Sequence, residues 1–273
     1  MTSEHVIDAE GASLSVEEAG GGPAVVLLHG LTATRRYVVM GSRSLERSGH
    51  RVIAYDARAH GRSSPAAEPS AYTYDDLVGD LEAVLDRLQV QRAVLAGASM
   101  GAHTLLAYAL AHPERVGGLV VITPAYDGNI GTQGRLERWD ALAQGLRENG
   151  VEGFVAAYGE PAGDPRWHDT VLKVIRQRLA LHEHPRALAD ALQVVPRSRP
   201  FPSISDLERI DAPVTIVASG DGADPGHPQR VGEAYAETIP GARLITDPPG
   251  TSPIAWQGSQ VSRLIAEVAR EAA

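Results

Sequence analysis

The stretch that most constrains this chain is a G-x-S-x-G pentapeptide, Gly97-Ala98-Ser99-Met100-Gly101, which lies between two patterns of different period. The apolar run Ala93-Val94-Leu95-Ala96 precedes it and is typical of a buried strand. The leucines of residues 105–110 follow it at helical spacing. A serine at such a turn has its hydroxyl at the edge of the sheet, and flanking glycines remove Cβ atoms that would collide there. Ser99 is therefore a candidate nucleophile, supported by Gly97 and Gly101.

The rest of the chain alternates strand and helix patterns. An antiparallel hairpin is predicted within residues 5–18, turning near Gly11-Ala12. Helical patterns occupy about 34–48 and 73–88, and Thr73 with Asp76 forms a capping box at the start of the second. Apolar runs predict strands at 24–28, 51–56, 93–96, 118–122, 213–218 and 243–246. This order predicts an α/β fold, a doubly wound and mostly parallel sheet that binds ligands beyond the carboxyl ends of its strands.

Strand patterns disappear between about Tyr126 and Asp206. Helical patterns replace them at 136–146, 151–158, 171–181 and 187–195, separated by breakers such as Gly150 and Pro185. We interpret residues 126–206 as a helical cap inserted into a core made of residues 1–125 and 207–273.

Composition excludes several classes of function. The 273 residues carry a net charge of −9, which disfavours a nucleic-acid or anionic-membrane partner. The chain has no cysteine, and hence no thiolate nucleophile and no Cys-rich metal site. The start, Met1 to His5, lacks a secretory signal, and the apolar runs are shorter than the roughly 20 residues that span a bilayer. We therefore expect a cytoplasmic protein with a small-molecule substrate, without a metal or a cofactor.

Other strand ends carry groups that acyl transfer needs. His29-Gly30-Leu31 follows the strand at 24–28, where the backbone N–H of Leu31 could bind an oxyanion together with that of Met100. Asp224 follows the strand at 213–218 and is either a catalytic carboxylate or part of a turn. Asp221, in the same loop, is the alternative acid.

Together these motifs resemble the α/β-hydrolase superfamily over nearly the whole chain. The resemblance rests on the His29-Gly30 corner, on residues 55–63 (Tyr-Asp-Ala-Arg-Ala-His-Gly-Arg-Ser), on the Ser99 pentapeptide and on Asp224-Pro225 after the cap. It implies Ser99 as nucleophile, Asp224 as triad acid, and Leu31 and Met100 as oxyanion donors. A serine at this point argues against the haloalkane-dehalogenase and epoxide-hydrolase branches, which place aspartate there.

One position departs from the family pattern. The family's base is a histidine in the loop after the last strand, but here Thr251 stands in its place and no histidine follows His227. A serine hydroxyl without a base is a poor nucleophile near neutral pH. His227, beside Asp224, is the first candidate for a displaced base, or else a residue that packs at a helix start. His103, one helical turn after Ser99, is the second candidate, or else packs between helix and sheet.

The remaining histidines and arginines have structural interpretations. His29 and His60 are expected to brace their turns through backbone hydrogen bonds. His182-Glu183-His184 lacks the H-E-x-x-H spacing of a metal site and is interpreted as an exposed helix end. Arg35 and Arg36 could meet an anionic substrate, although a solvated helix start is the favoured interpretation.

The sequence thus predicts a serine hydrolase that acts on a small carboxylic ester or a related acyl compound, with an esterase-like activity. Two alternatives remain because of Thr251. One is a hydrolase-fold protein that only binds a small ligand, and the other is a non-hydrolytic enzyme of the same fold.

Overall fold

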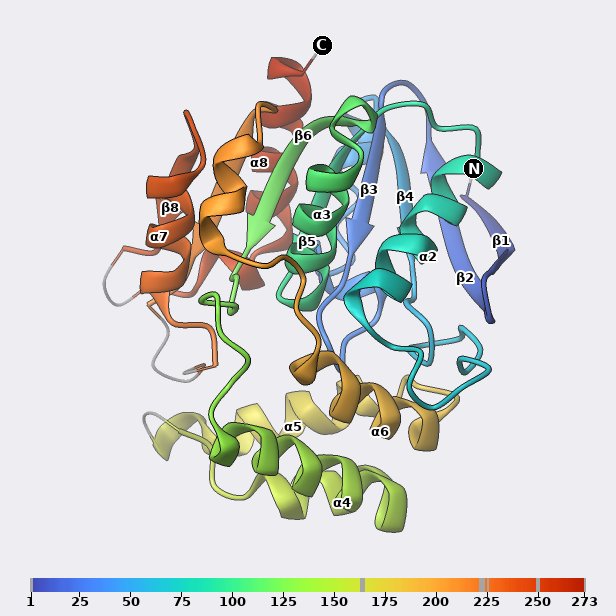
Figure 1. Cartoon of the computed structure of the whole chain (residues 1–273), viewed down its shortest axis with the longest axis vertical. Helices are drawn as coiled ribbons and strands as arrows, with labels where there is room; N and C mark the ends of the chain where they lie inside the picture. Colours follow the sequence, from blue (N-terminus) through green and yellow to red (C-terminus); the bar gives the residue numbers. More distant parts are fainter. Residues whose placement is uncertain (1, 163–164, 221–223, 225, 249–250, 273) are drawn as a thin grey trace.

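The computed structural model describes residues 2–162, 165–220, 224, 226–248 and 251–272. One eight-stranded sheet runs through it in the order β1-β2-β4-β3-β5-β6-β7-β8 (Figure 1). The strands are β1 (Thr2–Ala9), β2 (Ala12–Gly20), β3 (Ala24–Leu28), β4 (Arg51–Tyr55), β5 (Ala93–Ala98), β6 (Val116–Ile122), β7 (Val214–Ala218) and β8 (Arg243–Thr246). The pairs β1–β2 and β2–β4 are antiparallel and the other five are parallel. The expected mostly parallel sheet is confirmed.

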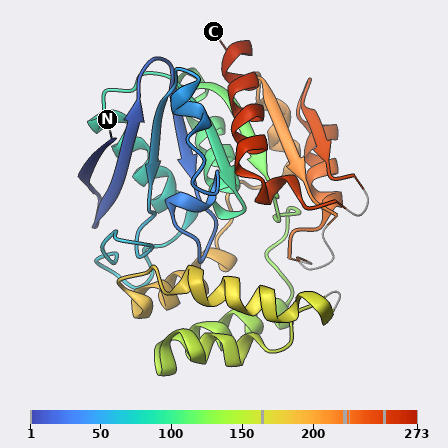
Figure 2. The ribbon, with the colours of Figure 1, turned by 180° about the vertical axis from the view of Figure 1, so that it is seen from behind.

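Helices cover both faces of this sheet because successive residues of each buried strand point to opposite sides. On one face Val26, Leu95 and Ile216 pack with α2 (Tyr74–Arg87), α3 (Met100–Ala111) and α7 (Gln229–Thr238). On the other face Val25 and Val94 pack with α1 (Ser44–Arg47) and α8 (Gly258–Glu271). Figure 2 shows α8 lying across this second face. The sheet is therefore doubly wound, as the strand–helix alternation predicts.

The capping box at Thr73 and Asp76 starts α2 as expected. The single helix expected over residues 34–48 is wrong. That segment holds only a short 3-10 helix, Arg35–Tyr37, and the four-residue α1. Met40 and Gly41 between them have φ values of 47° and 72°, and residues in this left-handed region end a right-handed helix.

Three helices form a separate layer beyond the carboxyl ends of the parallel strands (Figure 1). They are α4 (Gln133–Tyr158), α5 (His168–Leu179) and α6 (Pro185–Val194), and they carry an apolar cluster of their own. Gly150, with a φ of 60°, kinks α4 where the sequence predicts a break. This layer is the inserted helical cap, and we propose residues 126–206 as its extent.

Short 3-10 helices complete the connections. They lie at Pro113–Arg115, Pro165–Trp167, Val195–Arg197, Ile204–Arg209 and Ile254–Trp256. Among the helices of the described residues, none combines the length and the apolar composition required to cross a membrane.

Candidate active site

Ser99 occupies a strained turn between β5 and α3. Its φ of 50° and ψ of −111° lie in a region that residues other than glycine rarely adopt. Glycines make the turn possible, because a Cβ at Gly97 would lie 2.5 Å from the Gly101 carbonyl. A Cβ at Gly101 would lie 2.2 Å from the Leu28 carbonyl oxygen. The pentapeptide therefore forms the sharp strand-to-helix turn that its sequence predicts.

An imidazole from another loop reaches the Ser99 hydroxyl. The Nε2 atom of His227 lies 2.7 Å from Ser99 Oγ, and its Nδ1 atom lies 2.8 Å from Asp224 Oδ2. Because an ionised carboxylate only accepts hydrogen bonds, Nδ1 donates to Asp224, and Nε2 of the neutral ring is left to accept from Ser99. The three side chains thus form a chain of hydrogen bonds from acid to imidazole to hydroxyl.

The environment of Asp224 favours its ionised form. Burial alone would raise the pKa of this carboxyl, but the hydrogen bond and charge of His227 outweigh it, with a smaller effect from Arg178. The pKa of Asp224 is therefore held below its ordinary value, and the carboxylate is available as an acceptor at neutral pH.

The His29-Gly30-Leu31 corner lies against the turn. A Cβ at Gly30 would come within 3.3 Å of the Ser99 Cβ atom, so only glycine allows this approach without displacement. His29 fixes the corner, since its Nδ1 donates to the Gly30 carbonyl and its Nε2 accepts the Ala57 N–H. Leu31 follows directly, and Met100 is the first residue of α3, where a backbone N–H has no partner within the helix.

Among the described residues, neither His103 nor Thr251 bonds the Ser99 hydroxyl. Both ring nitrogens of His103 are occupied, Nδ1 by the Tyr74 hydroxyl and Nε2 by the backbone N–H groups of Ala125 and Tyr126. Burial, with the charges of His227 and Arg135, lowers the pKa of His103 to about 3. Thr251 is exposed and donates to the Pro248 carbonyl 2.7 Å away. Asp221 lies outside the described residues.

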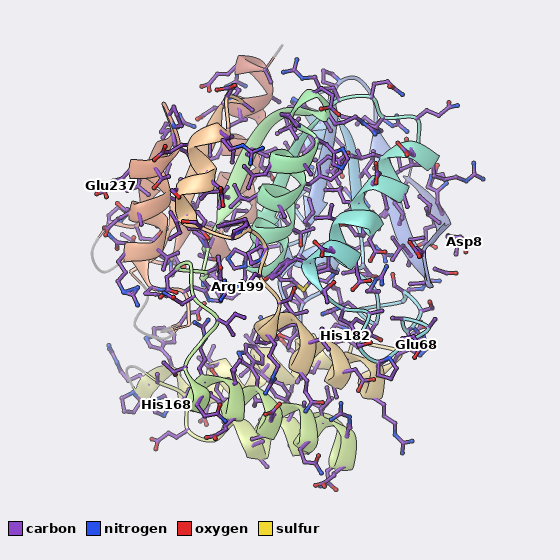
Figure 3. All side chains as sticks on the ribbon, in the orientation of Figure 1. Asp8, Glu68, His168, His182, Arg199 and Glu237 are labelled. Carbon is purple, nitrogen blue, oxygen red and sulfur yellow. The ribbon has the colours of Figure 1, made fainter. Side chains whose placement is uncertain are left out.

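His182 corrects one expectation of the sequence. It is buried at the junction of cap and core (Figure 3), not at an exposed helix end. Its Nε2 donates to the Thr32 carbonyl and its Nδ1 accepts the Gly61 N–H. His60 packs between His182 and His29 and bonds the Arg58 carbonyl. His182 therefore joins the cap to both loops behind the Gly30 corner.

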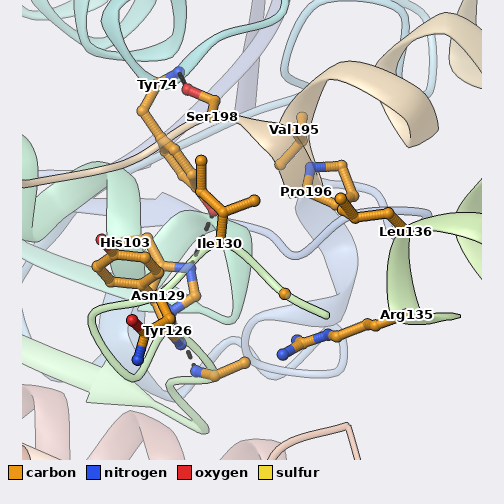
Figure 4. Close-up of a pocket in the computed structure, with 12 residues that line it drawn as sticks. Tyr74, His103, Tyr126, Asn129, Ile130, Arg135, Leu136, Val195, Pro196 and Ser198 are labelled. Atoms are coloured by element: carbon orange, nitrogen blue, oxygen red, sulfur yellow. Dashed lines mark hydrogen bonds between the residues drawn. The ribbon is translucent and has the colours of Figure 1, made fainter. Parts of the chain in front are cut away.

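A small pocket of about 60 Å³ opens beside this region (Figure 4). His103 and Tyr126 form its inner side, and Arg135 and Leu136 of α4 form its cap side. Ser99 and His227 are not among its lining residues, so the pocket is separate from the hydrogen-bonded triad. Arg35 forms an ion pair with Asp56, so it does not offer an unpaired charge to an anionic substrate.

Comparison with known proteins agrees with this architecture. A family model described as the alpha/beta hydrolase fold matches residues 23–258. The chain is an α/β hydrolase. A thermophilic esterase from Thermogutta terrifontis, solved with malate bound, resembles this hydrolase with a TM-score of 0.80 and 25% identity. That match covers 99% of both chains.

Curated relatives match this hydrolase over shorter regions. A protein named as a non-heme haloperoxidase, from Mycobacterium phage D29, is 37% identical over 126 residues, which cover 46% of this chain and 44% of that protein. An epoxide hydrolase from Caballeronia sordidicola is 31% identical over 171 residues, which cover 63% of this chain and 50% of that protein. The chain thus spans half or less of the length of these two relatives.

Arg178 is a residue of this region that no sequence motif singles out. It lies on α5, and its Nε atom is buried without a hydrogen-bond partner among the described residues. The only signal in the sequence is its spacing, three residues after Ile175 and four before His182, which places a charge on the buried face of the helix.

Proposed function

We propose that this hydrolase cleaves small carboxylic esters or related acyl compounds through an acyl-enzyme on Ser99. His227 is the proposed general base, and Asp224 the acid that orients it. The observation that carries the proposal is the pair of hydrogen bonds at His227, 2.7 Å to Ser99 Oγ and 2.8 Å to Asp224 Oδ2. These distances lie within the reach that direct proton transfer requires.

The proposed reaction proceeds in two balanced halves. Ser99 Oγ attacks the ester carbonyl carbon while Nε2 of His227 takes the hydroxyl proton, and the carbonyl oxygen becomes an oxyanion. The N–H groups of Leu31 and Met100 are proposed to bind this oxyanion, each contributing about 10²- to 10³-fold in rate. His227 then returns the proton to the leaving alcohol. In the second half, His227 takes a proton from water, which attacks the acyl-enzyme. The carboxylic acid leaves, and the proton returns to Ser99.

Two alternatives follow from Thr251, namely a protein that only binds ligand and a non-hydrolytic enzyme. Both were motivated by the lack of a base after the last strand. An imidazole that bonds Ser99 and a carboxylate supports a catalyst over a protein that only binds ligand, and turnover of simple esters separates hydrolysis from a non-hydrolytic reaction. A serine at this turn also favours ester over epoxide chemistry, since the epoxide-hydrolase branch places aspartate there.

Active-site labelling tests the proposal directly. Wild-type protein is incubated with a fluorophosphonate, and the modified residue is located by mass spectrometry, while short 4-nitrophenyl esters report turnover. We expect labelling at Ser99 that is abolished in Ser99→Ala. In His227→Ala we expect kcat/KM to fall by at least about 10³-fold.

Thr251→Ala serves as the matched control, because among the described residues the Thr251 hydroxyl bonds only the local Pro248 carbonyl. It is expected to label and turn over at the wild-type rate. If wild type is neither labelled nor active above background, the hydrolase proposal fails. Labelling that survives in His227→Ala at the full rate would remove His227 as the base.

A further inference from the structure

A guanidinium without a partner lies where the cap meets the core. Arg178 Nε is buried and makes no hydrogen bond in the part of the chain that the structure describes. Its two Nη atoms form neither a hydrogen bond nor an ion pair with any described residue. The Arg178 side chain as a whole is half-buried, and a charge that has lost part of its hydration is costly unless it is paired. An anion bound beside Arg178 would therefore supply the partner that the guanidinium lacks.

The position of Arg178 directs it toward the Gly30 corner. Ile175 and Leu179, on the same face of α5, are buried in the apolar cluster of the cap, and Leu31 packs against that cluster. One turn further, His182 bonds the Thr32 carbonyl. Because residues three apart share a helix face, Arg178 lies on the same side of α5 as Ile175, and so on the side of the cluster against which Leu31 packs.

The charges around Arg178 leave it unneutralised. Burial lowers the pKa of its guanidinium, and the one carboxylate with a marked opposing effect is Asp224, assisted by the hydroxyls of Tyr37 and Tyr158. Asp224 is already bonded to His227 and forms no ion pair with Arg178. An arginine stays protonated in proteins, so a positive charge persists beside the triad.

We propose that Arg178 binds a carboxylate of the substrate, so that the preferred substrate is an acyl compound with a second, negatively charged carboxylate group. This inference rests on the proposed function, because it names the substrate class of that same site. A planar guanidinium matches a carboxylate in a two-point fork. A single monovalent cation also suits a carboxylate better than a phosphate, whose charge approaches −2 at neutral pH.

Matched substrates test the charge preference. Monomethyl adipate and methyl hexanoate differ mainly in one terminal carboxylate, and ester hydrolysis is followed by proton release. We expect wild type to prefer the carboxylated ester, and Arg178→Gln to lower its kcat/KM by about 10- to 100-fold, mainly through KM. Hydrolysis of methyl hexanoate is expected to change less than about 2-fold. Arg178→Lys, which keeps the charge but not the fork, is expected to fall between them.

Arg176→Gln is the matched control on the same helix. Arg176 is exposed and paired with Glu152, so its removal is expected to leave both kcat/KM values unchanged. Thermal unfolding separates binding from folding. Arg178→Gln removes an unpaired, half-buried charge, and its Tm is therefore expected to equal or exceed that of wild type.

Binding without turnover separates this inference from the proposed function. Adipate is titrated by calorimetry into Ser99→Ala and into Ser99→Ala/Arg178→Gln, and tight binding only to the first supports the inference even if no ester is hydrolysed. Equal binding to both, or equal loss of both esters in Arg178→Gln together with a lower Tm, would overturn it while leaving the hydrolase proposal standing. Stronger binding of an alkyl phosphonate than of adipate would also overturn the assignment to a carboxylate.

Discussion

At the scale of single residues, the turn at Ser99 depends on atoms that are absent. The Cβ that Gly101→Ala would add lies 2.2 Å from a backbone carbonyl oxygen, which cannot move without displacing β3. We expect this variant to lose about 1–3 kcal/mol of unfolding free energy, measured in urea, and most of its fluorophosphonate labelling.

Gly79 supplies the control for Gly101. It lies inside α2, where an added Cβ meets no atom within 4 Å. Gly79→Ala is expected to be neutral or to stabilise by up to about 1 kcal/mol, since alanine is the better helix former. If Gly101→Ala behaved like Gly79→Ala, the crowded turn described above would be incorrect.

A substitution at Asp224 tests whether this residue orients the His227 imidazole, in addition to supplying a negative charge. In Asp224→Asn the amide no longer selects the His227 tautomer whose Nε2 accepts from Ser99, so the imidazole is a poor base even where it stays in place. We expect kcat/KM for 4-nitrophenyl esters to fall by about 10⁴-fold with little change in Tm. A loss below about 10-fold would show that His227 needs no such partner.

At the scale of elements, α2 is tied to the loop after β4 by a buried ion pair. Arg58 and Asp80 are 2% and 0% exposed, and two hydrogen bonds of 2.9 and 2.7 Å join the guanidinium to the carboxylate. Asp80→Ala leaves the buried cation without its two-point partner, with only the partly exposed Asp76 3.3 Å from Nη1, and we expect a loss of about 3–5 kcal/mol in urea unfolding. Arg58→Met/Asp80→Leu should recover much of it, and a double variant no more stable than Asp80→Ala would contradict this.

The elements also show where sequence patterns suffice. The buried strands are predicted within a few residues because each is a continuous apolar run, and the break at Gly150 follows from its chemistry. The helix predicted over residues 34–48 is wrong. The apolar residues Val38, Val39 and Leu45 have the spacing of a helical face, but turns hold them in the core. Periodicity reports which residues are buried, and here it does not report the backbone that buries them.

At the scale of the whole molecule, three buried imidazoles join cap and core. His60 lies between His29 and His182, at ring-centroid distances of 5.0 and 5.5 Å. Burial is the largest cause that lowers the pKa of each ring, to about 4 for His182. Repulsion from the other two imidazoles adds to this effect at His60, and repulsion from His29 adds to it at His182. The folded protein therefore holds these rings neutral where the unfolded chain would protonate them.

The consequence is a specific acid sensitivity. The stabilising contribution is fully present above about pH 6.5, the ordinary value for the unfolded chain, and is lost as the pH falls from there toward 4. Urea unfolding of wild type and of His182→Gln between pH 7.5 and 4.5 isolates this effect from ordinary carboxylates. We expect the stability difference between the two proteins to shrink by about 1–3 kcal/mol on acidification, and a constant difference would contradict the prediction.

The sequence predicts some residues of the candidate site better than others, and the reasons are physical. Ser99, Leu31 and Met100 belong to local motifs whose geometry follows from neighbouring residues. The choice between His227 and His103 depends on how the loop after β7 folds back, which single-sequence patterns do not encode. Arg178 belongs to no motif at all, and its position depends on the packing of α5 in the apolar cluster of the cap, against which Leu31 also packs.

The proposed acid and base lie in one loop, at positions 224 and 227, instead of in two loops on different strands. A single loop exchange can therefore transfer or remove both the acid and the base. An acid and a base in two different loops would have to be exchanged separately. Under the proposed function, the loop after β8, which includes Thr251, has no part in proton transfer. Grafting residues 224–227 into a related hydrolase, with that enzyme's own histidine after the last strand removed, becomes a compact way to relocate its base.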